Sequence, residues 1–228
     1  MSSHDEPTGS GDEIVIHSGP LSMFGAKAEM AAIEKGIRWR RVHVPFSIAK
    51  LYEPKSPVVE RVNPKQQVPV LVHGDLEIYD STQIFEYLED LSPAPRLWPS
   101  DPRDRARARL LELESDEVFF PNVVCCMPAR RAAAGVEAHA DAVAEIHRYF
   151  ERIDRHLANR DHLAGEFGYA DIAFYAAQFF ARFLGQPAAS DLRHLESWRL
   201  RMNERESTRT VMGEMADYLS ANGLETSI

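Results

Sequence analysis

Three polar residues stand directly before helical patterns in this sequence, where a side chain and the first turn of a helix can act together. Ser22 precedes a helical pattern that begins at Met23, and the pair Asp80-Ser81 precedes a second pattern. Serine and aspartate are preferred N-cap residues, because their oxygens accept hydrogen bonds from the first free N–H groups. The same N–H groups and the helix dipole also attract anions. Both positions are therefore candidates for capping, for anion binding, or for both.

A proline lies inside the strand-like run that leads to the second helix start. Val68 to His73 and Leu76 to Tyr79 form two such runs, joined by Gly74-Asp75, a connection typical of a β-hairpin. Pro69 has no N–H to donate to a sheet, so such prolines are confined to edges, first residues and bulges. The pattern therefore favours an edge position or a special backbone role for Pro69.

The elements that would position these residues follow from the spacing of apolar residues. Glu13 to His17 and Trp39 to Val44 are strand-like, and apolar residues at three- and four-residue steps predict a helix after Ser22. Strand, helix and strand in this order form a parallel unit with a right-handed crossover. Residues 45–64 are predicted to be irregular. The hairpin and its helix then complete a small α/β domain over residues 13–91.

Helical spacing replaces the strand pattern in the second half of the chain. The proline-rich segment 92–102 is the expected linker, and residues 103–222 are predicted to form an all-helical domain. Its first long helix is expected to be interrupted at Pro121, because proline removes an N–H from a helix. Residues 1–12 are predicted to be a disordered tail. The later helices are expected around residues 143–157, 172–184, 192–202 and 211–219.

Composition and charge exclude several classes of protein. The chain has 228 residues and a net charge of −9 without a basic stripe, which argues against nucleic acid or a membrane surface as partner. With no apolar run long enough to span a bilayer and no signal peptide, a cytoplasmic location is expected. Cys125 and Cys126 lie outside any CxxC pattern, and the histidines lack metal-binding spacing, so no disulfide framework and no metal are expected.

Four motifs in order along both predicted domains resemble those of the cytosolic glutathione S-transferases. SMFGAKAEMAAIEKGI is similar to the first helix of the serine-type classes, and NPKQQVPVLV to the segment before the third strand. IYDSTQIFEYLE resembles the glutathione-binding turn, and LAGEFGYADIAF the folding motif of the helical domain. The sequence is identified as a serine-type, theta- or beta-like bacterial member. This implies an α/β thioredoxin-like domain of β-α-β-α-β-β-α order, followed by an all-α helical bundle.

For Ser22 the resemblance implies the catalytic role. Its hydroxyl would donate a hydrogen bond to the sulfur of glutathione, and the helix start would further favour thiolate over thiol. The residue after this serine is usually proline in near relatives, whereas this chain has Met23. Ser18 is kept as a second candidate for the role, and a plain N-cap is the alternative for Ser22.

The resemblance also implies glutathione as the co-substrate and a set of residues that hold it. A cis Val68–Pro69 bond would let the backbone of Val68 pair with the peptide part of glutathione, as an added strand does. Asp80 and Ser81 would hold the ammonium and the carboxylate of the γ-glutamyl end. The residues expected at the glycine end are Gln67 and, as a weaker candidate, Lys55.

The resemblance also implies an activity, an oligomeric state and a pocket for the electrophile. The activity implied is conjugation of the glutathione thiolate to a small electrophile, with glutathione-dependent dehalogenation, ether cleavage or a non-enzymatic binding role as alternatives. A homodimer is expected. The electrophile pocket is predicted between the domains, lined by Met23, Phe24, Phe119, Phe120 and Val123.

One residue of the folding motif is expected to be structural. Asp171 in GYADIAF matches the buried folding aspartate of the family. Gly168 stands where the family commonly has a serine or threonine cap, so a side-chain acceptor is missing there.

Overall fold

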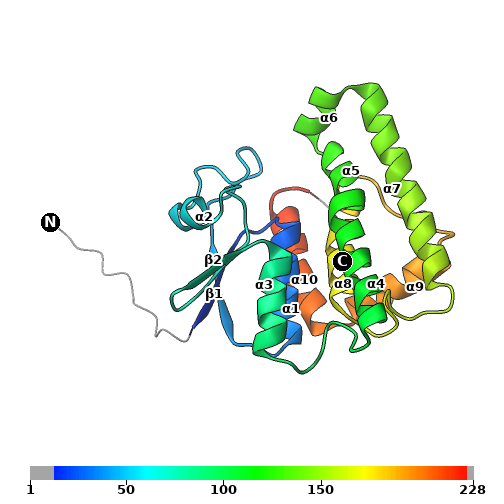
Figure 1. Cartoon of the computed structure of the whole chain (residues 1–228). Coiled ribbons are helices and arrows are strands. Elements are labelled where there is room, and N and C mark those ends of the chain that lie inside the picture. The colour runs from blue at the N-terminus through cyan, green and yellow to red at the C-terminus, as the bar shows by residue number, and fades with distance from the viewer. Residues whose placement is uncertain (1–12, 225–228) are drawn as a thin grey trace.

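Residues 13–224 are described by the structure, a computed structural model, and the tail predicted for residues 1–12 lies outside them. A four-stranded sheet lies beside a bundle of helices (Figure 1). The first elements are β1 (Ile14–Ser18), α1 (Met23–Glu34), β2 (Trp39–His43), α2 (Pro57–Val62), β3 (Val70–His73), β4 (Leu76–Tyr79) and α3 (Ser81–Leu91). Their order is the thioredoxin-like order that the resemblance implied.

Helix α2 corrects the prediction made from the residues alone, which made all of residues 45–64 irregular. The helix is only six residues long, Pro57–Val62, so it is too short for apolar periodicity to show. Pro57 stands in its first turn, where a missing N–H costs nothing.

The sheet is mixed, with strand order β2-β1-β3-β4. Strand β2 runs parallel to β1, whereas β3 is antiparallel to both β1 and β4. Helices α1 and α3 cover one face, where Ile16 and Leu71 of the sheet pack against residues such as Ala28 and Ile84. Helix α2 covers the other face through Val59, which packs with Val70.

The second part of the described chain adds helices and no further strand of this sheet. It begins with α4 (Pro102–Glu114), the π-helical turn η1 (Ser115–Phe119), α5 (Phe120–Cys125) and α6 (Pro128–Ala134). It continues with α7 (Val136–Leu157), α8 (Tyr169–Phe183), α9 (Arg193–Asn203) and α10 (Glu206–Ala221). The fold is therefore a thioredoxin-like domain followed by an all-helical domain, as the sequence predicted.

The interruption expected at Pro121 is present, and it takes a specific form. Helix α4 passes into the π-helical turn η1, and Pro121 then lies in the first turn of α5. Because proline has no N–H to donate, the π turn directly before it marks the place where the regular α-helical hydrogen-bond pattern is interrupted.

Helix α1 joins the two parts of the molecule, because it is buried on both sides. Ala28 and Ala32 face the sheet, while Ala26 and Met30 belong to the large core that includes Phe174 of α8. Such all-round burial is typical of a helix inside a protein. The complete burial of Met30 alone contributes on the order of 1.5–3 kcal/mol.

Asp171 has the structural role that was predicted. It is fully buried, and its carboxylate accepts hydrogen bonds from the backbone N–H groups of Leu163 (2.9 Å) and Gly168 (3.1 Å) and from the Trp198 indole (2.8 Å). A Cβ at Gly168 would lie 2.5 Å from the carbonyl oxygen of Leu97. This close approach explains why glycine replaces the expected capping side chain.

Candidate functional site

The strand register brings the predicted binding residues to one end of the sheet. His17 near the end of β1 pairs with Val70 at the start of β3, and Val70 also pairs with Tyr79 at the end of β4. The segments that continue from these three ends therefore lie together: the start of α1, the Val68–Pro69 segment and the start of α3. The loop after β2 joins them, because the N–H of Val44 donates to the carbonyl of Ser18 at 2.9 Å.

Ser22 is the N-cap of α1. Its Oγ accepts a hydrogen bond from the N–H of Gly25 at 2.9 Å, and the residue is 7% exposed. A hydroxyl that accepts from the backbone keeps its own O–H for a further acceptor. Capping and donation to a bound sulfur are therefore compatible.

Ser18, the second candidate for the same role, lies below the helix start. It is fully buried, and its Oγ is the nearest atom to the position that a Cβ on Gly25 would occupy. The Ser18 hydroxyl also lies close enough to the buried Glu29 carboxylate to influence its pKa. A side chain in this position faces the interior, so the structure favours Ser22 as the hydroxyl that can meet a ligand.

The Val68–Pro69 peptide bond is cis, as the resemblance implied. The described part of the chain offers no hydrogen-bond partner to the N–H or the C=O of Val68. The neighbouring Gln67 has an exposed side chain, and its carbonyl accepts from the Asn63 side chain at 2.6 Å. An unpaired donor and acceptor on one residue suit an extended peptide ligand.

The start of α3 presents one exposed and one buried polar residue. Asp80 is the exposed N-cap, with φ of 76°, and its carboxylate accepts from the N–H groups of Thr82 (3.1 Å) and Gln83 (3.3 Å). Ser81 is 3% exposed, and its carbonyl accepts from the Tyr169 hydroxyl at 3.0 Å. The free N–H groups and the dipole of α3 favour an anion here, while the Asp80 carboxylate favours a cation beside it.

A buried ion cluster supports both helix starts from the side of the helical domain. Lys27 of α1 has a fully buried side chain that pairs with Glu112 at 2.6 Å and with Asp116. Thr82 of α3 also donates to Glu112, at 2.6 Å. Burial raises the pKa of Asp116 to about 6, an effect that the Lys27 charge opposes and Glu112 reinforces. We call Lys27, Glu112 and Asp116 the interdomain ion cluster.

Lys55 already has a charged partner within the protein. Its ammonium group lies 3.2 Å from the Glu53 carboxylate, and a quarter of its side chain is exposed. Its positive charge is thus partly compensated.

The predicted pocket residues separate into two groups. Met23, Phe119 and Val123 are at most 2% exposed and belong to the large core, so their side chains offer no surface to a ligand. Phe24 and Phe120 are only partly buried and meet edge to face with ring centroids 5.5 Å apart. These two rings come from α1 and α5, at the boundary between the domains.

Tyr52 is a candidate that the sequence analysis missed. It comes from the segment predicted to be irregular, and its hydroxyl is shielded from solvent, with the Ser22 hydroxyl and the Leu21 backbone near enough to hydrogen-bond it and to oppose the rise that burial causes in its pKa. A Cβ on Gly19 would lie 2.9 Å from this hydroxyl oxygen. The parallel pairing of β1 with β2 was the only available signal, since it predicts that the loops after both strands lie together.

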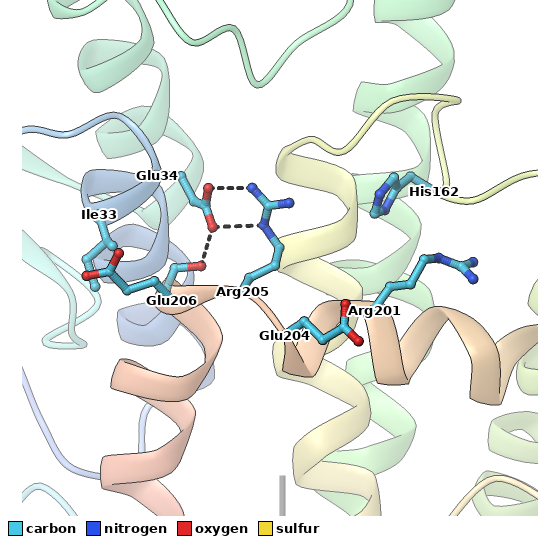
Figure 2. Close-up of a pocket in the computed structure, with 8 residues that line it drawn as sticks. Ile33, Glu34, His162, Arg201, Glu204, Arg205 and Glu206 are labelled. Atoms are coloured by element: carbon cyan, nitrogen blue, oxygen red, sulfur yellow. Dashed lines mark hydrogen bonds and ion pairs between the residues drawn. The ribbon is translucent and has the colours of Figure 1, made fainter.

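A cavity lies elsewhere, at the other end of α1. Its volume is about 580 Å³, and Figure 2 shows Glu34 of α1 facing Arg205 within it. Arg205 holds Glu34 through hydrogen bonds of 2.9 and 2.7 Å. Glu34 ends α1, roughly 18 Å from Ser22 at about 1.5 Å of rise per residue. The cavity therefore belongs to the joint between α1 and α10, away from the predicted site residues.

Residues 13–224 contain no group of three or more histidine, cysteine, aspartate or glutamate side chains arranged to hold a metal ion. Within the same residues, no helix is long and apolar enough to cross a membrane.

Comparison with protein families gives two matches, one for each domain. The model described as "Glutathione S-transferase, N-terminal domain" matches residues 16–96, and "Glutathione S-transferase, C-terminal domain" matches residues 121–206. Together these matches cover most of the described chain.

Individual relatives agree with the family matches. The chain is 29% identical over 217 residues to glutathione S-transferase U26 of Arabidopsis thaliana, an alignment covering 90% of both proteins. A tau class glutathione S-transferase from mango, Mangifera indica, shares the fold with a TM-score of 0.77 at 23% identity, over 92% of this chain and 98% of that one. A glutathione S-transferase from Methylobacillus flagellatus, solved with GSH bound, has a TM-score of 0.77 at 25% identity, over 87% and 98% of the chains.

Proposed function

The chain belongs to the cytosolic glutathione S-transferase family, and from this membership and its site we propose that it conjugates glutathione to a small electrophile. One observation carries the proposal: the capped starts of α1 and α3 and the unpaired backbone of Val68 lie at the same end of the sheet. These groups match the parts of glutathione, which has a thiol between two charged ends. The agreement between site and ligand supports glutathione as co-substrate.

Each end of glutathione has a chemically suitable partner in this arrangement. The γ-glutamyl carboxylate would accept from N–H groups at the start of α3 and from Ser81, while its ammonium group would face the Asp80 carboxylate. The backbone of Val68 would pair with the cysteinyl part. Gln67 would contact the glycine carboxylate, with Lys55 nearby once it leaves Glu53. Binding through both ends would fix the thiol near Ser22.

Ser22 would then activate the sulfur. A free thiol has a pKa near 8.5, so most of it is protonated at neutral pH. The Ser22 O–H would donate to the sulfur and lower this pKa, and the thiol proton would leave to solvent. The sulfur would attack the electrophilic carbon, so that the S–C bond forms as the bond to the leaving group breaks. Phe24 and Phe120 would line the apolar side of the pocket.

Glutathione binding and turnover test this proposal separately. Titration calorimetry should show saturable binding of glutathione, and a panel of aryl halides, haloalkanes, epoxides and aryl ethers should show glutathione-dependent product formation. Products from haloalkanes or ethers alone would favour the dehalogenase or ether-cleaving alternative. Binding without turnover would favour the non-enzymatic alternative. Absence of binding at millimolar glutathione would contradict the proposal altogether.

The narrower assignments stay predictions. The serine-type role rests on the position of Ser22, and a theta- or beta-like bacterial subtype gains no support from the plant relatives named above. A cytoplasmic location also stays a prediction.

A homodimer is supported by apolar side chains that are exposed in both domains. Leu76 and Tyr79 are exposed on β4, an edge strand, while Leu110 and Leu113 of α4 and Val118 of η1 are about half exposed. A second copy of the chain could cover these side chains, since burial of apolar surface favours association. Sedimentation velocity should show a dimer, and Leu113→Glu should shift it toward monomer. A monomer across micromolar concentrations of the unchanged protein would contradict the dimer.

A further inference from the structure

The first turn of α3 is held from the helical domain by two side-chain hydrogen bonds. The Tyr169 hydroxyl of α8 donates to the carbonyl oxygen of Ser81 at 3.0 Å. The Thr82 hydroxyl donates to the Glu112 carboxylate of α4 at 2.6 Å. We propose that Tyr169 and Thr82 are positioning residues, which hold this turn in the geometry that binds the γ-glutamyl end of glutathione. The inference rests on the proposed function, because it assigns two further residues to the same binding site.

The turn needs this support because Asp80, directly before it, has an unfavourable backbone conformation. Its φ is 76°, in a region that residues other than glycine seldom adopt. Such a residue keeps its conformation only where the surrounding structure imposes it. In this conformation the Asp80 carboxylate accepts from the N–H groups of Thr82 and Gln83. A turn that is already fixed loses less conformational freedom when a ligand binds, so the supports should contribute to affinity.

The acceptor of the Thr82 hydroxyl is itself fixed by a buried cation. One oxygen of Glu112, Oε1, accepts from the Thr82 hydroxyl and from the Lys27 ammonium group, each at 2.6 Å. The Lys27 side chain is fully buried, and only 6% of the Glu112 side chain is exposed. Hydrogen bonds to a charged group are strong, and shielding from water strengthens them further. A single carboxylate oxygen therefore ties the first turn of α3 to α1 and α4.

The second support is a tyrosine ring in a fixed position. The Tyr169 ring stacks on Phe85 of α3, with centroids 3.7 Å apart and 9° between the ring planes, and its edge meets Trp98 at 5.6 Å. Tyr169 is fully buried, so it cannot touch a ligand and acts only through the Ser81 backbone. Stacking and hydrogen bonding together fix the start of α3 against α8.

Thr82→Val removes the hydroxyl and keeps a β-branched side chain of similar shape. The dissociation constant of glutathione should rise roughly tenfold, as the loss of one hydrogen bond to a charged group causes. The kcat at saturating glutathione and the thiol pKa should stay unchanged, because the start of α1 is not altered. Thr82→Ser keeps the hydroxyl and should bind glutathione as the unchanged protein does. Calorimetry, steady-state kinetics and thiolate absorbance measure these quantities.

Tyr169→Phe tests the second support, and α8 itself offers a matched control. Tyr169 and Tyr175 are both fully buried, but the Tyr175 hydroxyl pairs with Asn203 inside the helical domain. Each change to phenylalanine removes one buried hydrogen bond, and denaturant titration measures the loss of stability in both variants. Glutathione should bind roughly five- to tenfold more weakly to Tyr169→Phe. Its affinity for Tyr175→Phe should be unchanged.

The outcomes separate this inference from the proposed function. Unchanged glutathione affinity in Thr82→Val or in Tyr169→Phe would overturn the role of that residue and leave the transferase intact. Equal weakening in Tyr169→Phe and Tyr175→Phe would also overturn it, because general destabilisation would then explain both. A fall in kcat without a loss of affinity would contradict a positioning role in binding. An unchanged protein that does not bind glutathione would instead remove the proposed function, and this inference with it.

Discussion

The N-terminal ends of α1 and α3 lie at the same end of the sheet, but their surroundings are opposite. Ser22 at the start of α1 is 7% exposed and has the buried Tyr52 hydroxyl beside it. Asp80 at the start of α3 is exposed and already accepts two backbone N–H groups. An enclosed hydroxyl acts strongly on a nearby charge because little water screens it, whereas an exposed carboxylate can receive a charged group from solution. Under the proposed function, the start of α1 would therefore supply the chemistry and the start of α3 would bind the charged end of glutathione.

Both helix starts depend on the interdomain ion cluster, so its loss should have the largest effect. Lys27→Met leaves Glu112 and Asp116 buried without their cation, and we expect a loss of about 3–5 kcal/mol in the free energy of unfolding. Denaturant titration measures this loss. Lys65→Met, at an exposed position, is the control and should change stability by less than about 0.5 kcal/mol. A similar small change in Lys27→Met would show that the cluster does not hold the domains together.

Removing the Ser22 hydroxyl at the buried start of α1 should affect catalysis more than glutathione binding. Ser22→Ala is expected to lower kcat by about 10²- to 10³-fold, as loss of one preorganised donor to a bound anion does. It also removes the cap of α1, at about 1 kcal/mol of stability. Steady-state kinetics and glutathione calorimetry separate the two effects. If kcat is unchanged while stability falls, Ser22 is only a helix cap.

A change at the exposed start of α3 should affect glutathione binding more than catalysis. Asp80→Asn keeps a capping oxygen and a side chain that tolerates positive φ, but it removes the negative charge. We expect glutathione to bind about 10- to 100-fold more weakly, because a charge-assisted hydrogen bond is lost. The kcat at saturating glutathione should change much less. A larger loss in kcat than in affinity would reverse the comparison between the two helix starts.

The pH dependence of stability should show the titration of one residue of the interdomain ion cluster. The pKa of Asp116 is raised above 3.8, to about 6, in the folded protein, so the folded state binds this proton more tightly than the unfolded state. Its contribution to stability is present below the ordinary pKa and is lost as pH rises from about 4 to 6.

Asp116→Asn cannot ionise and should remove this part of the pH dependence. Denaturant midpoints measured between about pH 4 and 6 should then fall less steeply than in the unchanged protein. Asp90→Asn, at an exposed position on α3, is the control. Equal slopes for the unchanged protein and Asp116→Asn would contradict the raised pKa.

The sequence predicted the elements well where the signal is local. The strands, the hairpin and the long helices follow from the alternation and periodicity of apolar residues, and Ser22 and Asp80 were identified as caps from residue type. The same signal could not separate their roles, because whether a helix start is enclosed or exposed depends on contacts with distant segments, such as that of Tyr52 with Gly19. The cis geometry of Val68–Pro69 required the family resemblance.

Contacts between the two domains could not be predicted from the sequence either, because they join segments that are far apart in the chain. Lys27 in the apolar pattern of α1 gives no sign that its partners are Glu112 and Asp116, since ion pairs across domains leave no periodic trace. The pocket prediction shows the same limit. The spacing of aromatic residues on a helix does not show whether a ring is buried in the core, as Phe119 is, or stays partly exposed, as Phe120 does.

The thiol pKa of bound glutathione tests the central claim most directly. Thiolate absorbance of the saturated complex, measured against pH for the unchanged protein and for Ser22→Ala, gives this pKa without any assumption about the electrophile. The account predicts a value at least about one unit below the free value near 8.5, and a return toward 8.5 in the variant. A bound thiol that titrates near 8.5 in both proteins would contradict the assignment of chemistry to the start of α1.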